Sequence, residues 1–242
     1  MYSPPEMRGA LMGSLRNFLN HMDWHSLLMT VFTAAAALLC LTVHELCHGL
    51  TAYRLGDPTA KNAGRLTLNP LRHIDPLGLL LMLTAHVGWA KPVPVDMRHF
   101  KRPKLGMALT ALAGPVSNFL LAWLFLAVSG FLVRLLPFSA AWHFYLTAFF
   151  VNAALLSVGL GIFNLIPVPP MDGSRILFAF FPDRIYYGIL RYERYIMLAM
   201  LVLVWLGVFS GPLSTLIYYG MEGLCFLSGM PFDTALVFLS LF

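Results

Sequence analysis

The chain has 242 residues, of which 59% are apolar and 11% are charged. Soluble domains carry about 25% charged residues, so this composition excludes a single soluble globular domain and indicates a protein that faces lipid. The formal net charge is +5, but the basic residues lie in short loops between apolar segments, which is typical of membrane topology rather than of nucleic-acid binding.

The first 23 residues are mildly amphipathic, which predicts a segment lying on the membrane interface. They lack the basic flank and apolar run of a cleavable signal peptide. The three cysteines are odd in number, lie in apolar stretches and form no CxxC pair. No disulfide framework is therefore expected.

The apolar segments that follow predict an all-α polytopic membrane protein. A helix needs about 20 residues to cross a bilayer, so the apolar run 77–87 is too short and is expected to form a re-entrant hairpin. Two prolines in 89–95 favour an extended strip after it. We expect one membrane domain over residues 1–242 with about five to six membrane helices. The segments assigned to them are 24–55, 105–136, 140–166, 195–209 and 213–227. The tail 235–242 is also apolar but is too short to span.

The distribution of basic residues predicts the orientation. If residues 77–87 do not cross, 13 of the 16 Lys and Arg share one side, which the positive-inside rule places in the cytoplasm. They are Arg54, Lys61, Arg65, Arg72, Lys91, Arg98, Lys101, Arg102, Lys104, Arg175, Arg184, Arg191 and Arg194.

The first predicted span contains the sequence HExxH, formed by His44, Glu45 and His48. Residues at i and i+4 of a helix lie on one face, so the two imidazoles can bind one zinc ion while the glutamate acts on a water molecule. Ionisable residues inside a membrane helix are costly and usually functional. Cys47 lies about 60° from His44 around the helix axis and is expected to be a small packing residue rather than a metal ligand.

A catalytic zinc ion usually has three protein ligands. Asp172 is the leading candidate, because segments 105–136 and 140–166 cross and return the chain to the side of His48. Prolines 167, 169 and 170 prevent a helix there and allow the chain to bend inward. Capping of the next helix is another possible role for Asp172. The rival ligands are Asp57, Asp75, His73 and His86, whereas Glu193 and Glu222 lack a second motif.

HExxH in an early membrane helix, followed by NLIPVPPMDG at the end of a later one, resembles the site-2 protease family of intramembrane zinc metalloproteases. The segments GWAKPVPV (88–95) and AGPVSN (113–118) also resemble family segments, the second being the family's Gly-Pro-x-x-Asn helix start. The resemblance implies one zinc ion held by His44, His48 and Asp172. It implies that Glu45 is the catalytic base and acid and that Asn164 lies near the active site, where its amide can stabilise an oxyanion.

Several finer expectations depend on this resemblance. Asn118 is expected to pack against the core helices or the loop. The chain has no room for the PDZ or CBS domain of many relatives and resembles a compact form. The strip 90–95 is expected to pair with an extended substrate through Lys91, Pro92, Val93 and Pro94.

The predicted function is regulated intramembrane proteolysis in a prokaryotic cell membrane, with the active site nearer the cytoplasmic side. The partners are transmembrane protein substrates and lipid, without nucleic acid. Three alternatives stay open: a protease with a glutamate as third ligand, a catalytically silent zinc-binding module, and a transporter. No second Glu-rich motif surrounds Glu193 or Glu222, silent relatives often lose the equivalent of Glu45, and residues 195–227 offer few polar groups for transport.

Overall fold

The computed structural model describes residues 23–75, 91–135 and 141–242, and in this part of the chain all regular secondary structure is helical. This confirms the predicted all-α class. The elements are α2 (Trp24–Arg54), α3 (Thr59–Asn62), η1 (Pro70–Arg72), η2 (Met97–His99), α5 (Pro103–Leu135), α6 (Ala141–Asn164), α7 (Asp172–Phe178), α8 (Asp183–Trp205), α9 (Ser210–Ser228) and α10 (Phe232–Leu239).

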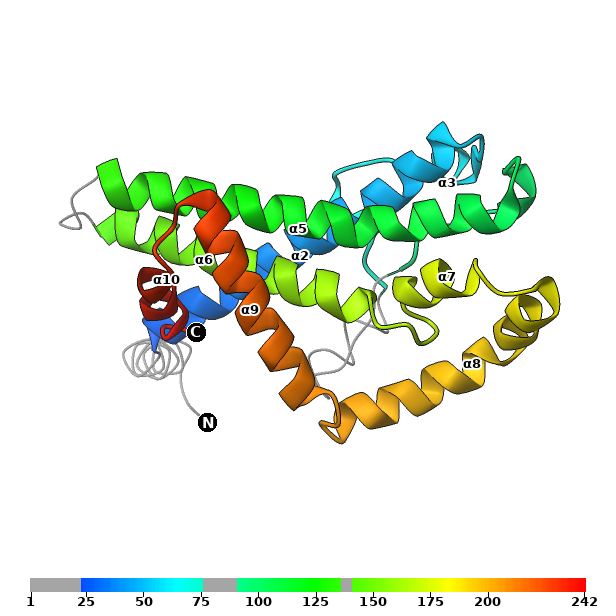
Figure 1. The fold of residues 1–242 in the computed structure, drawn as a ribbon. Helices are drawn as coiled ribbons and strands as arrows, with labels where there is room; N and C mark the ends of the chain where they lie inside the picture. Colours follow the sequence, from blue (N-terminus) through cyan, green and yellow to red (C-terminus); the bar gives the residue numbers. More distant parts are fainter. Residues whose placement is uncertain (1–22, 76–90, 136–140) are drawn as a thin grey trace, which may run out of the picture.

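Helices α2, α5 and α6 form the centre of the molecule and lie side by side (Figure 1). They have 31, 33 and 24 residues, and at 1.5 Å per residue each is at least as long as the roughly 30 Å hydrocarbon core of a bilayer. All three are apolar enough to cross a membrane. The predicted spans 24–55, 105–136 and 140–166 are therefore confirmed to within about two residues.

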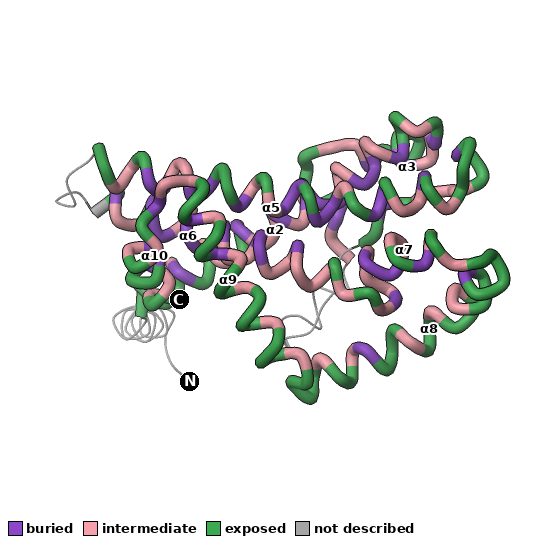
Figure 2. Tube along the Cα trace, viewed as in Figure 1, coloured by how far each residue is buried: buried purple, intermediate pink, exposed green. Residues whose placement is uncertain are grey.

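Small residues allow these three helices to approach closely. Ala36 and Cys40 of α2, Ala122 of α5, and Ala153 and Ala154 of α6 are all fully buried in one apolar cluster. Lipid offers no hydrophobic driving force between helices, so close packing of small side chains is the usual means of association. Figure 2 shows the buried residues concentrated where these helices meet.

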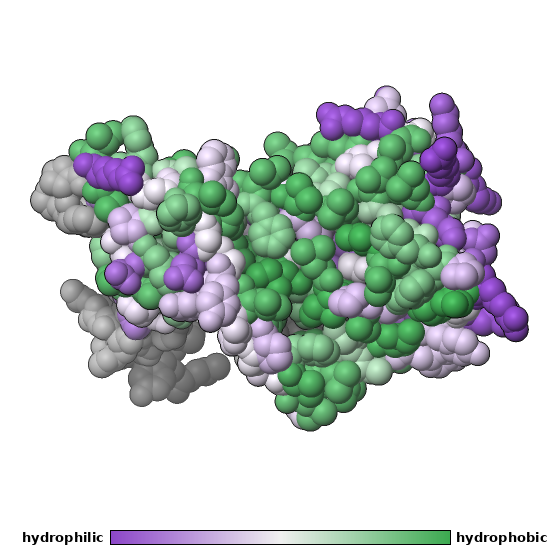
Figure 3. Space-filling model, in the orientation of Figure 1, coloured by the Kyte–Doolittle hydropathy of each residue, from purple (hydrophilic) through white to green (hydrophobic). Residues whose placement is uncertain are grey.

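The polar surface gathers at one end of the bundle. Helix α2 ends there, α5 begins there, and the hydrophilic surface in Figure 3 is densest there, near α3. The amide of Lys91 donates to the carbonyl of His73 over 2.9 Å, so both sides of the segment 76–90 lie together at this end. The hairpin predicted for 77–87, like the interfacial segment predicted before Asp23, lies outside the described residues.

Two predictions about helices are wrong. Helix α8 begins at Asp183, twelve residues before the predicted span, and α8 and α9 meet at 82°, so that they qualify as one bent span at most. The described residues contain three candidate spans, or four with the bent pair, so the predicted count of five to six is not confirmed in this part of the chain. Gly114 and Pro115 do not begin a helix either, because they lie inside α5.

Candidate metal centre and active site

The three predicted metal ligands lie together at the polar end of the bundle. His44 and His48 come from α2, and Asp172 is the first residue of α7. The two Nε2 atoms are 2.9 Å apart, and Asp172 Oδ2 lies 3.2 Å from each. In the described residues this is the one group of three or more His, Cys, Asp or Glu side chains arranged to hold a metal ion.

Each ligand is positioned by the local chain. His44 and His48 are one turn apart on α2, which directs both rings to one side. Helix α6 ends at Asn164, and the proline-rich segment after it cannot continue the helix. The chain therefore turns, and α7 packs against α5 with Asp172 in its first turn. The capping role considered for Asp172 does not apply to its side chain, because the cap residue of α7 is Met171.

Both imidazoles have a second partner from α5. His48 Nδ1 lies 2.7 Å from the carbonyl oxygen of Thr110, which can only accept, so Nδ1 carries the proton and Nε2 keeps its lone pair. His44 Nδ1 lies 3.0 Å from the amide nitrogen of fully buried Asn118, whose amide oxygen has no hydrogen-bond partner. Exchanging the amide nitrogen and oxygen, which have nearly the same shape, lets Asn118 accept from Nδ1–H and leaves Nε2 of His44 free as well.

Gly114 provides the space for the two rings. A Cβ atom at this position would lie 2.4 Å from Cε1 of His48 and 2.6 Å from Cε1 of His44. Helix α5 can therefore carry no side chain here without displacing the ligands.

The donor set fits a zinc ion. Two imidazole lone pairs and a carboxylate oxygen converge, and Asp172 Oδ2 is buried without a hydrogen-bond partner. Three such groups repel one another unless they share a cation, and two His with one carboxylate are common ligands of catalytic zinc. Second partners on the outer ring nitrogens are typical of such sites.

Glu45 lies beside this cluster and is 9% exposed. Its Oε2 accepts a hydrogen bond of 2.9 Å from the amide of Val93, in the strip 91–96. The strip has no regular secondary structure, as predicted from its prolines. A cavity of about 290 Å³ opens at this point, and its lining comprises His44, Glu45, His48, Pro92, Val93, Val95, Met107, Thr110, Ala111, Asn164, Pro170, Asp172 and Arg175.

Asn164 lines this cavity from the end of α6, and its amide nitrogen donates to Leu160 of its own helix over 2.9 Å. Of the predicted substrate strip, Pro92 and Val93 line the cavity. Lys91 and Pro94 do not line it, and the amide and carbonyl of Lys91 are bonded to His73 and Arg65.

The rival ligands have other partners. Asp57 binds Thr59, the amide of Asp96 and His99, while Glu193 pairs with Arg175. His73 Nε2 contacts the Thr67 carbonyl. His86 lies outside the described residues, and Cys47 is not part of the metal cluster.

Sequence reasoning missed the contribution of α5. Thr110, Gly114 and Asn118 follow one another at four-residue spacing and form the face toward the histidines. Asn118 is a polar residue in an apolar helix, and this alone could have marked it as a candidate for the site. Its partner depends on how α2 and α5 align, which periodicity does not reveal.

The fold and the site define a class: a helical protein with membrane-spanning candidates and a His-His-Asp cluster, arranged to hold a metal ion, beside a glutamate. Comparison with protein families matches residues 132–207 to Peptidase family M50. The chain is 38% identical over 204 residues to "Putative zinc metalloprotease YwhC" of Bacillus subtilis, covering 82% of this chain and 89% of that protein.

Two less similar relatives also carry the description of a zinc metalloprotease. "Putative zinc metalloprotease Rip2" of Mycobacterium tuberculosis is 33% identical over 151 residues, covering 61% of this chain and 56% of the relative. The protein of the same name from Mycolicibacterium smegmatis is 30% identical over 151 residues, covering 59% and 54%. The chain thus spans about half of these longer relatives. No solved structure matches it.

The chain belongs to peptidase family M50, the site-2 protease family that its motifs resemble. It is a zinc metalloprotease and a membrane protein. The predicted enzyme class and cofactor are confirmed.

Proposed function

We propose that this chain is an intramembrane protease whose zinc ion is held by His44, His48 and Asp172 and whose general base and acid is Glu45. The observation that supports this most directly is the convergence of three ligand atoms within 3.2 Å, one of them a buried carboxylate oxygen without a hydrogen-bond partner. Glu45 lines the same cavity and can reach a water molecule held there.

The position of the site along α2 favours cleavage below the membrane surface. His48 precedes Arg54 by six residues, which is about 9 Å along a helix. If Arg54 marks the polar boundary, the site lies below the membrane surface. The peptide bonds that reach it then lie within or near a transmembrane segment of the substrate. The basic end of the molecule then faces the cytoplasm by the positive-inside rule, and the membrane is a prokaryotic cell membrane, as for the bacterial relatives.

The chain's own residues perform the proton transfers. When bound, zinc supplies a Lewis acid that brings the pKa of a water molecule to about 7. Glu45 takes the proton of the attacking water and later returns it to the leaving amine. The Asn164 amide can donate to the developing oxyanion once it releases the Leu160 carbonyl. Thr110 and Asn118 keep the two imidazoles in the orientation that directs Nε2 to the metal.

The substrates are transmembrane proteins cleaved as part of regulated intramembrane proteolysis. A helical substrate hides its carbonyls in its own hydrogen bonds, so it must be extended at the cavity. Val93, which lines the cavity, offers its carbonyl to such a segment. Lipid is the other partner, no nucleic acid is involved, and the chain acts as one membrane domain.

The test is cleavage of a model transmembrane substrate by the purified Glu45→Gln variant. An amide cannot accept the proton, so the rate should fall about 10²- to 10⁴-fold, while one zinc ion per chain remains. Glu222→Gln, at an exposed position in α9, is the matched control and should cleave normally. Full activity of Glu45→Gln would contradict the proposal, and an inactive wild type that binds zinc would favour the silent binding module.

A further inference from the structure

The strip 91–96 places a backbone amide on the proposed base. Val93 is buried, and its N–H donates to Glu45 Oε2 over 2.9 Å. The strip belongs to no helix, so its position depends on the groups that hold it. Those groups determine which way the Glu45 carboxylate points.

One of these groups is Arg65, in the loop between α3 and η1. Its side chain is buried, with 5% of the residue exposed, and Nη2 donates to the carbonyls of Lys91 and Pro92, the latter at 3.3 Å. It forms no ion pair with a described carboxylate, and its Nε is buried without a partner. A buried guanidinium in this state is costly, which indicates that its hold on the strip has a function.

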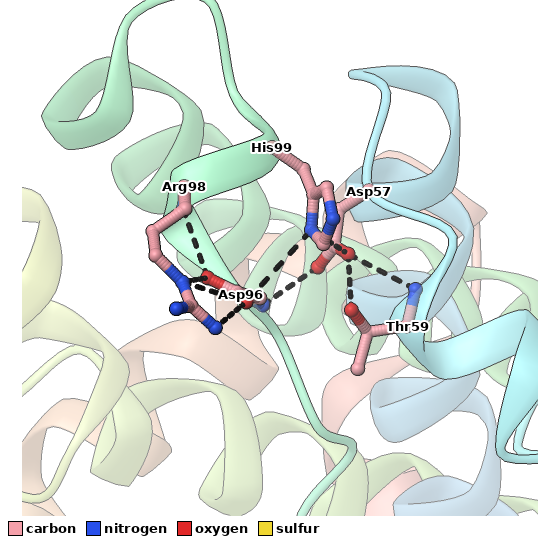
Figure 4. A network of polar contacts seen from close by, with 5 residues as sticks. All are labelled: Asp57, Thr59, Asp96, Arg98 and His99. Carbon is pink, nitrogen blue, oxygen red and sulfur yellow. Dashed lines mark hydrogen bonds and ion pairs between the residues drawn. The ribbon is translucent and has the colours of Figure 1, made fainter.

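The other end of the strip is held by a cluster that we call the Asp57 clasp, formed by Asp57, Thr59, Asp96, Arg98 and His99 (Figure 4). The amide of Asp96 donates to fully buried Asp57 over 2.7 Å. Thr59 and His99 bind the other carboxylate oxygen, and Arg98 pairs with Asp96. Arg65 and Asp57 both follow α2, so the helix that carries Glu45 also leads to both anchors of the strip.

We propose that Arg65 is a positioning residue for the proteolytic reaction. It fixes the strip just before Val93, the Asp57 clasp fixes it just after, and the Val93 amide is thereby kept on Glu45. This inference rests on the proposed role of Glu45. A displacement of about 1 Å in a catalytic group can lower the rate 10²-fold. Among the described residues, Arg65 forms no hydrogen bond or ion pair with His44, His48 or Asp172, so zinc binding should not depend on it.

The first experiment compares Arg65→Ala and Arg65→Lys with Arg72→Ala, which removes an exposed cation from η1. We expect kcat of Arg65→Ala to fall about 10- to 100-fold, with KM changed less than about threefold and one zinc ion retained per chain. Arg65→Lys should lie between it and wild type, because an ammonium group can still donate to the carbonyls but is more strongly hydrated than a guanidinium and costs more to bury. Arg72→Ala should match wild type.

Unchanged kcat in Arg65→Ala, an effect confined to KM, or loss of zinc would each overturn the proposal. A second variant avoids dependence on the folding of Arg65→Ala. Val93→Pro removes the amide hydrogen directly and should lower kcat to a similar extent. Val93→Pro combined with Arg65→Lys should be no slower than Val93→Pro alone, because both changes act on one hydrogen bond.

Additive losses in that double variant would also contradict the proposal. Glu45→Gln distinguishes the two levels of inference. If it is inactive while Arg65→Ala retains full kcat, only the positioning role fails. If Glu45→Gln is fully active, the proposed function fails with it.

Discussion

The proposed metal centre and helix α8 are built in opposite ways. At this site α2 and α5 approach so closely that no side chain would fit at Gly114. Every ring nitrogen of His44 and His48 has a defined neighbour. Helix α8 stands away from the bundle in Figure 1, and most of its residues are exposed or half-buried in Figure 2. Its polar links to the bundle include Lys104–Asp183 and Arg175–Glu193.

The difference shows where the molecule tolerates change. A site that must orient three ligands and a base needs partners for its buried polar groups, because each unsatisfied group is costly in an apolar surrounding. Helix α8 has few such constraints. Equivalent substitutions in the two regions should therefore differ sharply in effect.

The largest effect is expected from Gly114→Ala. The new Cβ would overlap both imidazole rings, so the ligands must move. We expect zinc affinity and cleavage to fall at least about 100-fold, and overpacking to destabilise the protein by about 1–3 kcal/mol. Zinc titration and thermal unfolding in detergent measure both. Normal zinc affinity in this variant would show that α5 does not confine the histidines.

Asn118→Ala should have a smaller effect on the metal. It removes the partner of His44 Nδ1, and loss of such outer partners costs about 10- to 100-fold in metal affinity or activity. Asn152→Ala is a matched control, because Asn152 is also buried but bonds to Thr33 on α2, away from the cluster. Equal zinc affinities for the two variants would mean that Asn118 only packs.

The Asp57 clasp should respond to acid. Burial raises the pKa of the Asp57 carboxyl, but hydrogen bonds from Thr59 and the Asp96 amide outweigh it, with His99 adding to them, and the pKa lies below its ordinary value. A lowered pKa means that the stabilisation is complete above the ordinary value of about 4 and is lost as the pH falls through the lowered value.

Hydrogen exchange of the Asp96 amide tests this dependence. The amide should be protected at neutral pH and lose protection only below about pH 4. Asp57→Asn should lower protection at neutral pH and remove its acid dependence, whereas Asp233→Asn, at an exposed position in α10, should change neither. Protection that is the same in wild type and Asp57→Asn at all pH values would contradict the clasp.

The smallest effect is expected from Gly188→Ala in α8. No atom lies within 4 Å of the added Cβ, and alanine favours a helix by about 0.5–1 kcal/mol over glycine. Slight stabilisation with unchanged zinc binding is therefore expected from thermal unfolding and metal analysis. A loss comparable to that of Gly114→Ala would show that α8 is packed as tightly as the metal centre.

The contrast between the proposed metal centre and α8 is also instructive about which features the sequence predicts and which it does not. Helices α2, α5 and α6 were predicted within about two residues, because long apolar runs flanked by charges are unambiguous. HExxH and Asp172 stand out as ionisable residues in apolar surroundings. The α8–α9 bend was missed, because hydropathy does not distinguish a spanning helix from one lying along a surface. The roles of Asn118, Gly114 and Arg65 depend on contacts between distant segments.

Zinc content of purified Asp172→Ala, after dialysis against a weak chelator, tests the central claim most directly. We predict one zinc ion per chain in wild type and in the exposed-position control Asp233→Ala, and almost none in Asp172→Ala, because two histidines alone would compete poorly with the chelator. One tightly bound zinc ion in Asp172→Ala would contradict the three-ligand site formed by His44, His48 and Asp172.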